Sequence, residues 1–335
     1  MHRPSSTHVR TRIALAAAVA SGLFLAACGG GGDSSSQQPL TQAQATADAA
    51  NGAEMGSGSA SSVDTIFDTT QTIATASVTA AAASRAHAEG ATGIVDVVVN
   101  CAGGGTATIT ISGGTLETQL NGRFDAGEHY SLSFAQCSGR LGLAQVNGGV
   151  EMDIVNVATT ATGSTTSATL NLSNLSVAFP GGSVTYNGAE NLSRVVVNGD
   201  NLATTTTSTL TSDHIGIAAT YNSRSANFVL SNVDVARTVD AVAGIPTGSS
   251  ISGHHTLNGS ANGQDYSYTV STNGGVSYDA TGTPVSGSWT TLRPDATIVT
   301  TVADAMVTIT VDEGNNGSID STWTFPIAQL VAAAD

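Results

Sequence analysis

The chain of 335 residues contains no lysine, so all ten of its basic residues are arginine. Chemistry that needs a lysine amine, such as Schiff-base formation or phosphate binding in a P-loop, is therefore excluded. Acidic residues number 25, which gives a formal net charge of −15. A surface of this sign repels phosphate backbones and anionic lipid headgroups. We therefore expect no nucleic-acid partner.

Aromatic side chains are also scarce, at 4% of the residues. Trp289 and Trp323, with Phe325 beside the second, lie in strand-like sequence near the end of the chain. A tryptophan can stack on a sugar ring, or it can anchor a core that is otherwise built from small aliphatic side chains. Two tryptophans are too few to favour the sugar-binding interpretation over the core.

Cysteine occurs only three times, and Cys28 ends a distinctive N-terminal pattern. Three arginines within the first twelve residues precede an apolar run at residues 13–24, and Leu25-Ala26-Ala27-Cys28 follows. A basic start, a short apolar run and small residues are typical of a signal peptide, and about a dozen apolar residues are too few to span a bilayer. We therefore expect residues 1–27 to be a signal peptide.

The sequence Leu25-Ala26-Ala27-Cys28 resembles the lipobox of bacterial lipoproteins. That resemblance implies cleavage before Cys28, diacylation of its sulfur and acylation of its new amino group. Gly29 stands where an aspartate would retain such proteins in the inner membrane, so the resemblance implies an outer-membrane anchor facing the periplasm or the cell surface. Loss of residues 1–27 removes three arginines and no acid, which brings the net charge to −18.

Residues 28–61 are rich in Gly, Ser and Gln and have little apolar surface to bury, so they predict a flexible tether behind the acylated cysteine. The other two cysteines, Cys101 and Cys137, form an even pair in an oxidising compartment. Such a pair predicts a disulfide.

Along the rest of the chain, the spacing of the apolar residues changes once, from a helical period to a period of two. Apolar residues recur at helical spacing between Val63 and Ser84, after a Ser61-Ser62 cap, and predict a helical segment within residues 62–90. From residue 91 the alternation has a period of two, as in the Thr-Ile repeats of residues 106–111 and 307–311. We expect a β-rich domain over residues 91–328 and a short tail over residues 329–335.

Turn signals and an internal sequence repeat, here called the internal echo, describe this β domain further. Asn-Gly steps, which favour tight hairpins, occur at Asn121, Asn147, Asn187, Asn198, Asn258, Asn262, Asn273 and Asn316. Residues 167–178 are similar to residues 225–236, which indicates two related units. The sequence predicts a mainly β fold, an antiparallel meander forming an elongated sandwich or a curved sheet, with a β-solenoid as the alternative.

Catalytic motifs are weak. No serine has glycine two residues before and two residues after it, as a nucleophile elbow requires, and Gly248–Gly253 is only a partial match. The adjacent His254 and His255 of one strand should point to opposite faces and cannot readily share a metal; we interpret them as a surface strand pair.

The acidic segment from Asp312 to Asp320 is the best candidate for a cation site. Asp312, Asn316 and Asp320 supply oxygen ligands of the kind that calcium prefers. Gly314 offers no side chain at the third position, however, and no bidentate glutamate closes the loop. A hairpin with an acidic tip is the simpler interpretation, so we expect no cofactor and keep calcium as the alternative.

These patterns favour a non-enzymatic, lipid-anchored envelope protein with a structural or binding role, whose partner is an envelope protein or a polysaccharide. Two alternatives stay open. One is a secreted hydrolase, such as a carbohydrate-active enzyme with an acidic pair that the sequence does not reveal. The other is a carrier of a hydrophobic ligand, which would need an apolar cavity. The sequence leaves the oligomeric state open.

Overall fold

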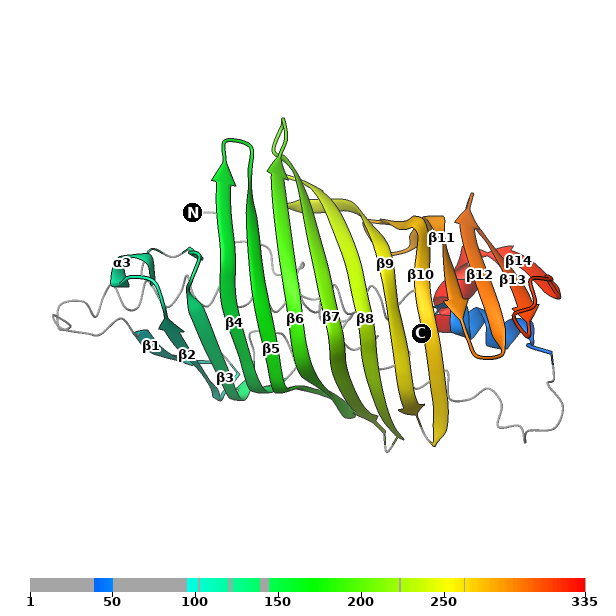
Figure 1. Ribbon diagram of the computed structural model, residues 1–335, viewed down its shortest axis with the longest axis horizontal. Helices are drawn as coiled ribbons and strands as arrows, with labels where there is room; N and C mark the ends of the chain where they lie inside the picture. The colour runs from blue at the N-terminus through cyan, green and yellow to red at the C-terminus, as the bar shows by residue number, and fades with distance from the viewer. Residues whose placement is uncertain are drawn as a thin grey trace.

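The computed structural model describes residues 39–50, 95–101, 103–119, 121, 123–138, 145–222, 224–261 and 263–334. Within them, fourteen strands form one antiparallel sheet in which each strand pairs with the next along the chain (Figure 1). The strands are β1 (Val95–Asn100), β2 (Thr106–Ser112), β3 (His129–Ser138), β4 (Gln145–Thr160), β5 (Gly163–Phe179), β6 (Gly182–Asn198), β7 (Ala203–Tyr221), β8 (Arg224–Val242), β9 (Ile245–Ala261), β10 (Gln264–Asp279), β11 (Pro284–Leu292), β12 (Ala296–Ala303), β13 (Met306–Glu313) and β14 (Ser321–Pro326).

The sheet is long, curved and open, with β1 at one end and β14 at the other (Figure 1). Its end strands have six residues each, whereas β7 and β8 in the middle have 19. The predicted antiparallel meander is confirmed, and of the forms considered the structure has the curved single sheet.

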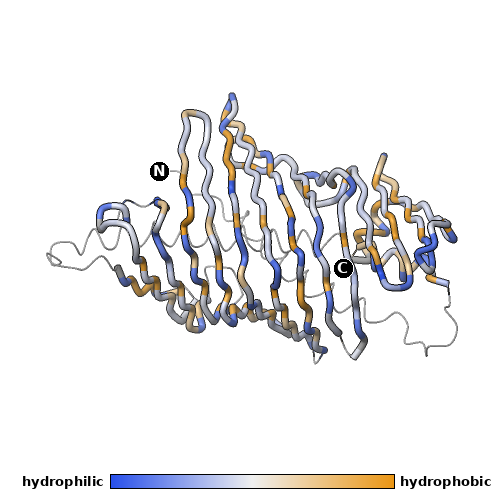
Figure 2. Tube along the Cα trace, viewed as in Figure 1, coloured by the Kyte–Doolittle hydropathy of each residue, from blue (hydrophilic) through white to orange (hydrophobic). Residues whose placement is uncertain are grey.

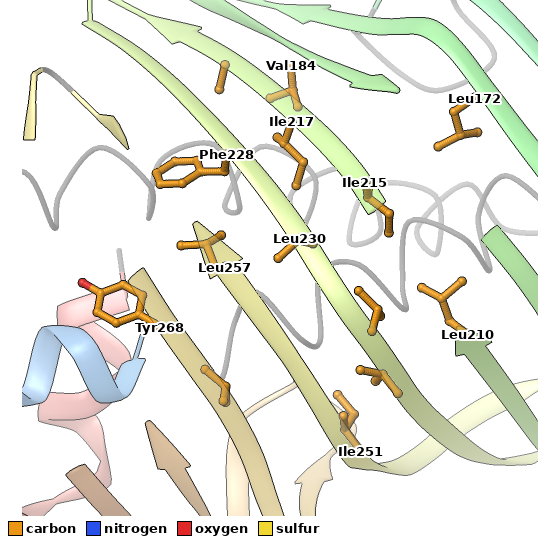
Figure 3. Packing of buried hydrophobic residues seen from close by; sticks show 14 of the residues in the cluster. Leu172, Val184, Leu210, Ile215, Ile217, Phe228, Leu230, Ile251, Leu257 and Tyr268 are labelled. Carbon is orange, nitrogen blue, oxygen red and sulfur yellow. The ribbon is translucent and has the colours of Figure 1, made fainter. Parts of the chain in front are cut away.

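Alternation along each strand separates a buried face from a polar face. In β2, Ile109 and Ile111 are 1% exposed, while the alternating Thr108 and Thr110 are partly exposed. Ile215, Leu230 and Leu257 are cross-strand neighbours on β7, β8 and β9 and form part of the core (Figure 3). The opposite side, here called the polar face, carries mainly Thr, Ser and Asn. A one-residue shift in register would exchange the two sets, so the pattern fixes the pairing.

Residues 42–50 form a helix that packs on the buried face, beside Tyr268 of β10 (Figure 3). Ala45 and Ala49, one turn apart, are fully buried. Tyr268 Oη donates to Asp48 Oδ1 at 3.0 Å, and Arg293 Nη1 donates to Asp48 Oδ2 at 2.5 Å. The prediction of a flexible tether over residues 28–61 is therefore wrong for this part. Alanine is the strongest helix former, and its small side chain lets the helix lie close to the sheet.

The C-terminal prediction also needs correction. Residues 329–335 were expected to be a tail, but α4 (Ile327–Ala334) is a helix, and its Leu330 is 3% exposed. A single helical turn, α3 (Leu116–Gln119), connects β2 to β3. The predicted signal peptide, Cys28 and the predicted helix from Val63 to Ser84 lie outside the described residues.

A line of β-bulges crosses the sheet from β3 to β11. We call this line the crease. Asn174 of β5 and Asn232 of β8 have φ angles of 47° and 50° there, and they occupy the same position in the two related segments. Gly253 of β9 has a φ of 128°, and a Cβ on it would lie 1.9 Å from the carbonyl oxygen of Asp234. The internal echo therefore encodes a shared bulge.

The crease corrects part of the turn prediction. The Asn-Gly steps at Asn147, Asn187, Asn258 and Asn273 lie inside strands, whereas the step at Asn316 lies in the turn between β13 and β14. Asn262 lies outside the described residues. Gly148, which follows Asn147, has a φ of 96° within β4. A bulge needs the same left-handed backbone as a tight turn, so the dipeptide alone does not distinguish the two.

Candidate functional site

The crease opens a groove of about 470 Å³ between β6 and β9. Half of its twelve lining residues are both exposed and polar, which places its opening on the polar face. The side chains that give the groove its chemistry are Asn191, Asp213, His214, Asn232, Asp234 and His254. It combines amide, carboxylate and imidazole groups, so it can donate and accept several hydrogen bonds at once.

A bulge in β7 builds the centre of this groove. Ser212 and Ile215 are buried, whereas Asp213 and His214 between them are both exposed. Ser212 Oγ donates to the Ala189 carbonyl oxygen at 2.6 Å and accepts the His214 main-chain N–H at 3.1 Å. The bulge therefore turns two consecutive side chains toward solvent, which regular strand geometry does not allow.

The second wall comes from β8 and β9, where Asp234 and His254 are register partners and both exposed. The next residue, His255, points to the opposite face and is 3% exposed. Burial, with a smaller contribution from His254, lowers the pKa of His255 to about 4. The prediction that the two histidines face opposite sides is confirmed, but their interpretation as a surface pair is wrong for His255.

Glu190 is a buried acid that sequence reasoning missed. It borders the groove, but its register partner on β5 is the fully buried Leu170, so its carboxyl group lies on the buried face. The side chain is 3% exposed, and its Oε2 accepts no hydrogen bond. Burial raises its pKa to about 7. The available signal was its position two residues before the buried Leu192, in phase with the apolar side chains.

The acidic hairpin uses its oxygens internally. Asp312 accepts the main-chain N–H groups of Asn316 and Gly317 at 3.0 and 2.8 Å, and Asp320 accepts that of Glu313 at 2.7 Å. These bonds stabilise the turn between β13 and β14. In the described part of the chain, no group of three or more His, Cys, Asp or Glu side chains is arranged to hold a metal ion.

Three other residues considered in the sequence analysis have structural roles. Cys101 and Cys137 form the predicted disulfide, with a Cα–Cα distance of 5.3 Å, and link the end of β1 to β3. Trp289 is 1% exposed, and its Nε1 donates to the Ala49 carbonyl oxygen at 3.0 Å. Trp289 is therefore a core anchor and cannot stack on a sugar, whereas Trp323 is half-buried beside the core.

Comparisons with protein-family models, curated proteins and solved structures find no significant match to this chain. None of the helices that the structure describes is long and apolar enough to cross a membrane.

Proposed function

We propose that this protein is a lipid-anchored envelope protein that binds a neutral, hydroxyl-rich polymer, such as a polysaccharide, on the polar face of its sheet. Cys28 carries the lipid in this proposal, and the groove along the crease is the centre of the binding surface. The observation that carries the proposal is the groove. The bulges keep the four strands β6 to β9 paired in one sheet and at the same time open a polar groove across them.

The chemistry around the groove supports a neutral polar ligand. Hydroxyl groups pair across strands on the polar face, as in Thr207–Thr238 at 3.0 Å and Thr256–Thr269 at 3.2 Å. Each hydroxyl can both donate and accept, as the hydroxyl groups of a sugar do. The net charge of −15 disfavours an anionic polymer.

The hydrolase alternative is not favoured by the positions of the acids. A glycosidase needs two carboxyl groups flanking one bond. Glu190 has the perturbed pKa, but it lies on the buried face, whereas Asp213 and Asp234 are exposed in the groove. A carrier of a hydrophobic ligand would need a large apolar cavity. The cavity beside His255 has a volume of about 20 Å³, which has room for only one water molecule, so it does not support the carrier alternative.

The test is binding of neutral polysaccharides to the purified chain, with Asp234→Ala and His254→Ala as groove variants. Asp265→Ala is the matched control, because Asp265 is exposed on β10 and does not line the groove. We expect each groove variant to weaken binding about tenfold, the loss of a typical charge-assisted hydrogen bond, and the control to bind normally. Equal affinities in all variants would contradict a role for the groove.

A further inference from the structure

The strands end in two rows of turns, one along each long side of the sheet, and we call these two sides its long edges. One long edge is unusually apolar. The hairpins β4–β5, β6–β7, β8–β9, β10–β11 and β12–β13 all turn along it, at the upper side of Figure 1. Of the twelve large apolar side chains that are exposed among the described residues, six lie in or next to these turns. We call this set the apolar rim: Val197, Leu202, Val242, Ile245, Val285 and Met306. Figure 2 shows apolar colour at the β12–β13 turn and in the strand ends below the β6–β7 turn, whose tip is hydrophilic.

The central members of the rim form one patch. Leu202, at the tip of β6–β7, is 75% exposed, and Ile245, at the start of β9, is 56% exposed. The Ala243 main-chain N–H donates to the Leu202 carbonyl oxygen at 3.0 Å, and Val242 pairs with both Ala203 and Ile245. The two neighbouring hairpin tips are therefore joined, and their exposed apolar side chains are adjacent.

The backbone makes these apolar residues unexpected. Leu202, Ala243 and Ala305 have φ angles of 61°, 52° and 60°. Turn positions of this kind favour Gly, Asn or Asp, because a branched side chain is strained there. The opposite edge follows that rule, with Gly181, Asn222 and Gly263 at its positive-φ turn positions. Leu202, the member of the apolar rim with this backbone, thus combines steric strain with an exposed apolar side chain, a combination that marks an interaction site.

The charges beside the rim restrict its partner. Asp200 and Asp304 lie in these turns, Asp240 and Asp279 lie near the ends of β8 and β10, and no described arginine lies in the turns. Two rims would bring carboxylates together, which disfavours a second copy, and anionic lipids would be repelled for the same reason. Zwitterionic phosphatidylethanolamine offers an ammonium group to the carboxylates and an apolar boundary beneath it.

We propose that the apolar rim inserts into the interface of a zwitterionic lipid bilayer, so that the sheet stands on the membrane on this edge. The inference rests on the proposed function only in so far as the Cys28 anchor brings the domain to a membrane. It adds a second, reversible contact that orients the sheet, with the polar face and its groove directed along the membrane surface.

The test is flotation of the Cys28→Ser chain with vesicles of phosphatidylethanolamine and phosphatidylcholine. This chain cannot be acylated at residue 28, but it keeps the apolar residues 13–24. The difference in binding between the rim variants and their control therefore reports on the rim, and it is independent of whether Cys28 takes a lipid. We expect Leu202→Asp and Val242→Asp each to reduce the bound fraction about tenfold or more, the cost of losing one buried aliphatic side chain. Ile319→Asp is the control, because Ile319 is 65% exposed in the β13–β14 turn at the other edge.

Four results would overturn the proposal, and three of them concern the vesicles. The Cys28→Ser chain would fail to bind the vesicles, the Ile319→Asp control would lose binding as strongly as the rim variants, or binding would require phosphatidylglycerol. Aspartate tolerates the left-handed backbone at position 202, so Leu202→Asp should fold, and circular dichroism of each variant checks this. A dimer in solution that only the rim variants dissociate would also overturn the proposal, in favour of a second copy.

Discussion

At the scale of single residues, Leu202 and Glu190 each contradict a local rule. Leu202 holds a bulky side chain at a φ of 61° while 75% exposed, and Glu190 holds an acid at 3% exposure with an unpaired oxygen. Neither is explained by the stability of the sheet. Both therefore give predictions in which a substitution improves stability.

Leu202→Asn should stabilise the fold, because asparagine adopts the left-handed backbone more easily than leucine. We expect a gain of about 1 kcal/mol in the free energy of unfolding, the order of the left-handed penalty for a non-glycine residue. Urea unfolding measures it. Val197→Asn is the matched control: Val197 is 49% exposed on β6 and its φ is not positive, so it should give no gain. An unchanged or lower midpoint for Leu202→Asn would contradict the strain.

Glu190 should make stability fall as pH rises. Burial raises the folded-state pKa from 4.5 to about 7, so the acid is neutral in both states below pH 4.5. Above that pH the unfolded chain ionises first, and stability is lost until the folded carboxyl ionises near pH 7. The loss is about 3 kcal/mol, to an order of magnitude. Glu190→Gln should therefore be more stable than the parent at pH 7.5 and nearly equal to it at pH 4.5.

The comparison with Glu190→Gln is needed because His255 acts in the opposite sense. Burial lowers its pKa from 6.5 to about 4, so its contribution is present above pH 6.5 and is lost as pH falls toward 4. The difference between parent and Glu190→Gln cancels this effect. A difference that does not change between pH 4.5 and 7.5 would show that Glu190 is not buried as described.

At the scale of elements, the strands were predictable and the helix of residues 42–50 was not. Alternation of Thr and Ile marks β2 and β13 because one face of each strand is buried. The helix has local signals, namely its alanines and the hydrogen bonds between Thr41 and Gln44 at its start, but its short sequence does not reveal where it packs. Its Asp48 contacts Arg293, 245 residues away in the chain. The groove was missed for a related reason, since Asp213 and Asp234 meet only through the register of β7 and β8.

Asp48→Ala should loosen the N-terminal helix. Asp48 is 7% exposed and its removal leaves Arg293 with Asp295 alone. We expect a loss of about 2 to 3 kcal/mol, somewhat below the range for breaking a fully buried pair. Urea unfolding measures the loss, and faster proteolysis at residues 39–50 locates it. Asp295→Ala is the control, because removing this half-exposed carboxylate should lower the free energy of unfolding by less than about 1 kcal/mol. Equal losses of stability in Asp48→Ala and Asp295→Ala would contradict this role of Asp48.

Replacing both Cys101 and Cys137 by serine should destabilise the β1–β3 end of the sheet. The disulfide closes a loop with a sequence separation of 36 residues. The chain-entropy model gives a loss of about 3 to 4 kcal/mol. Urea unfolding of the double variant, and of the parent with and without reductant, measures the loss. If reductant still lowers the stability of the double variant, the loss of stability in the parent does not come from this disulfide.

At the scale of the whole molecule, the sequence predicted an antiparallel meander and left open whether it forms an elongated sandwich, a curved sheet or a β-solenoid. It did not reveal that alternate turns share an edge, nor that exposed large apolar side chains gather along one of the two edges. That asymmetry, together with a groove on one face, gives the sheet distinct sides. A protein held to a membrane through residue 28 could use one edge for lipid and one face for its ligand.

The central claim is that this sheet belongs to a lipid-anchored envelope protein, and the mass of the N-terminal peptide tests it most directly. Expression in a bacterium with a lipoprotein-processing pathway, followed by protease digestion and mass spectrometry, identifies the first residue and its modification. The account predicts a chain that starts at Cys28 and carries a diacylglyceryl group and an N-acyl chain. A chain that retains residues 1–27, or one that starts elsewhere with an unmodified Cys28, would contradict it.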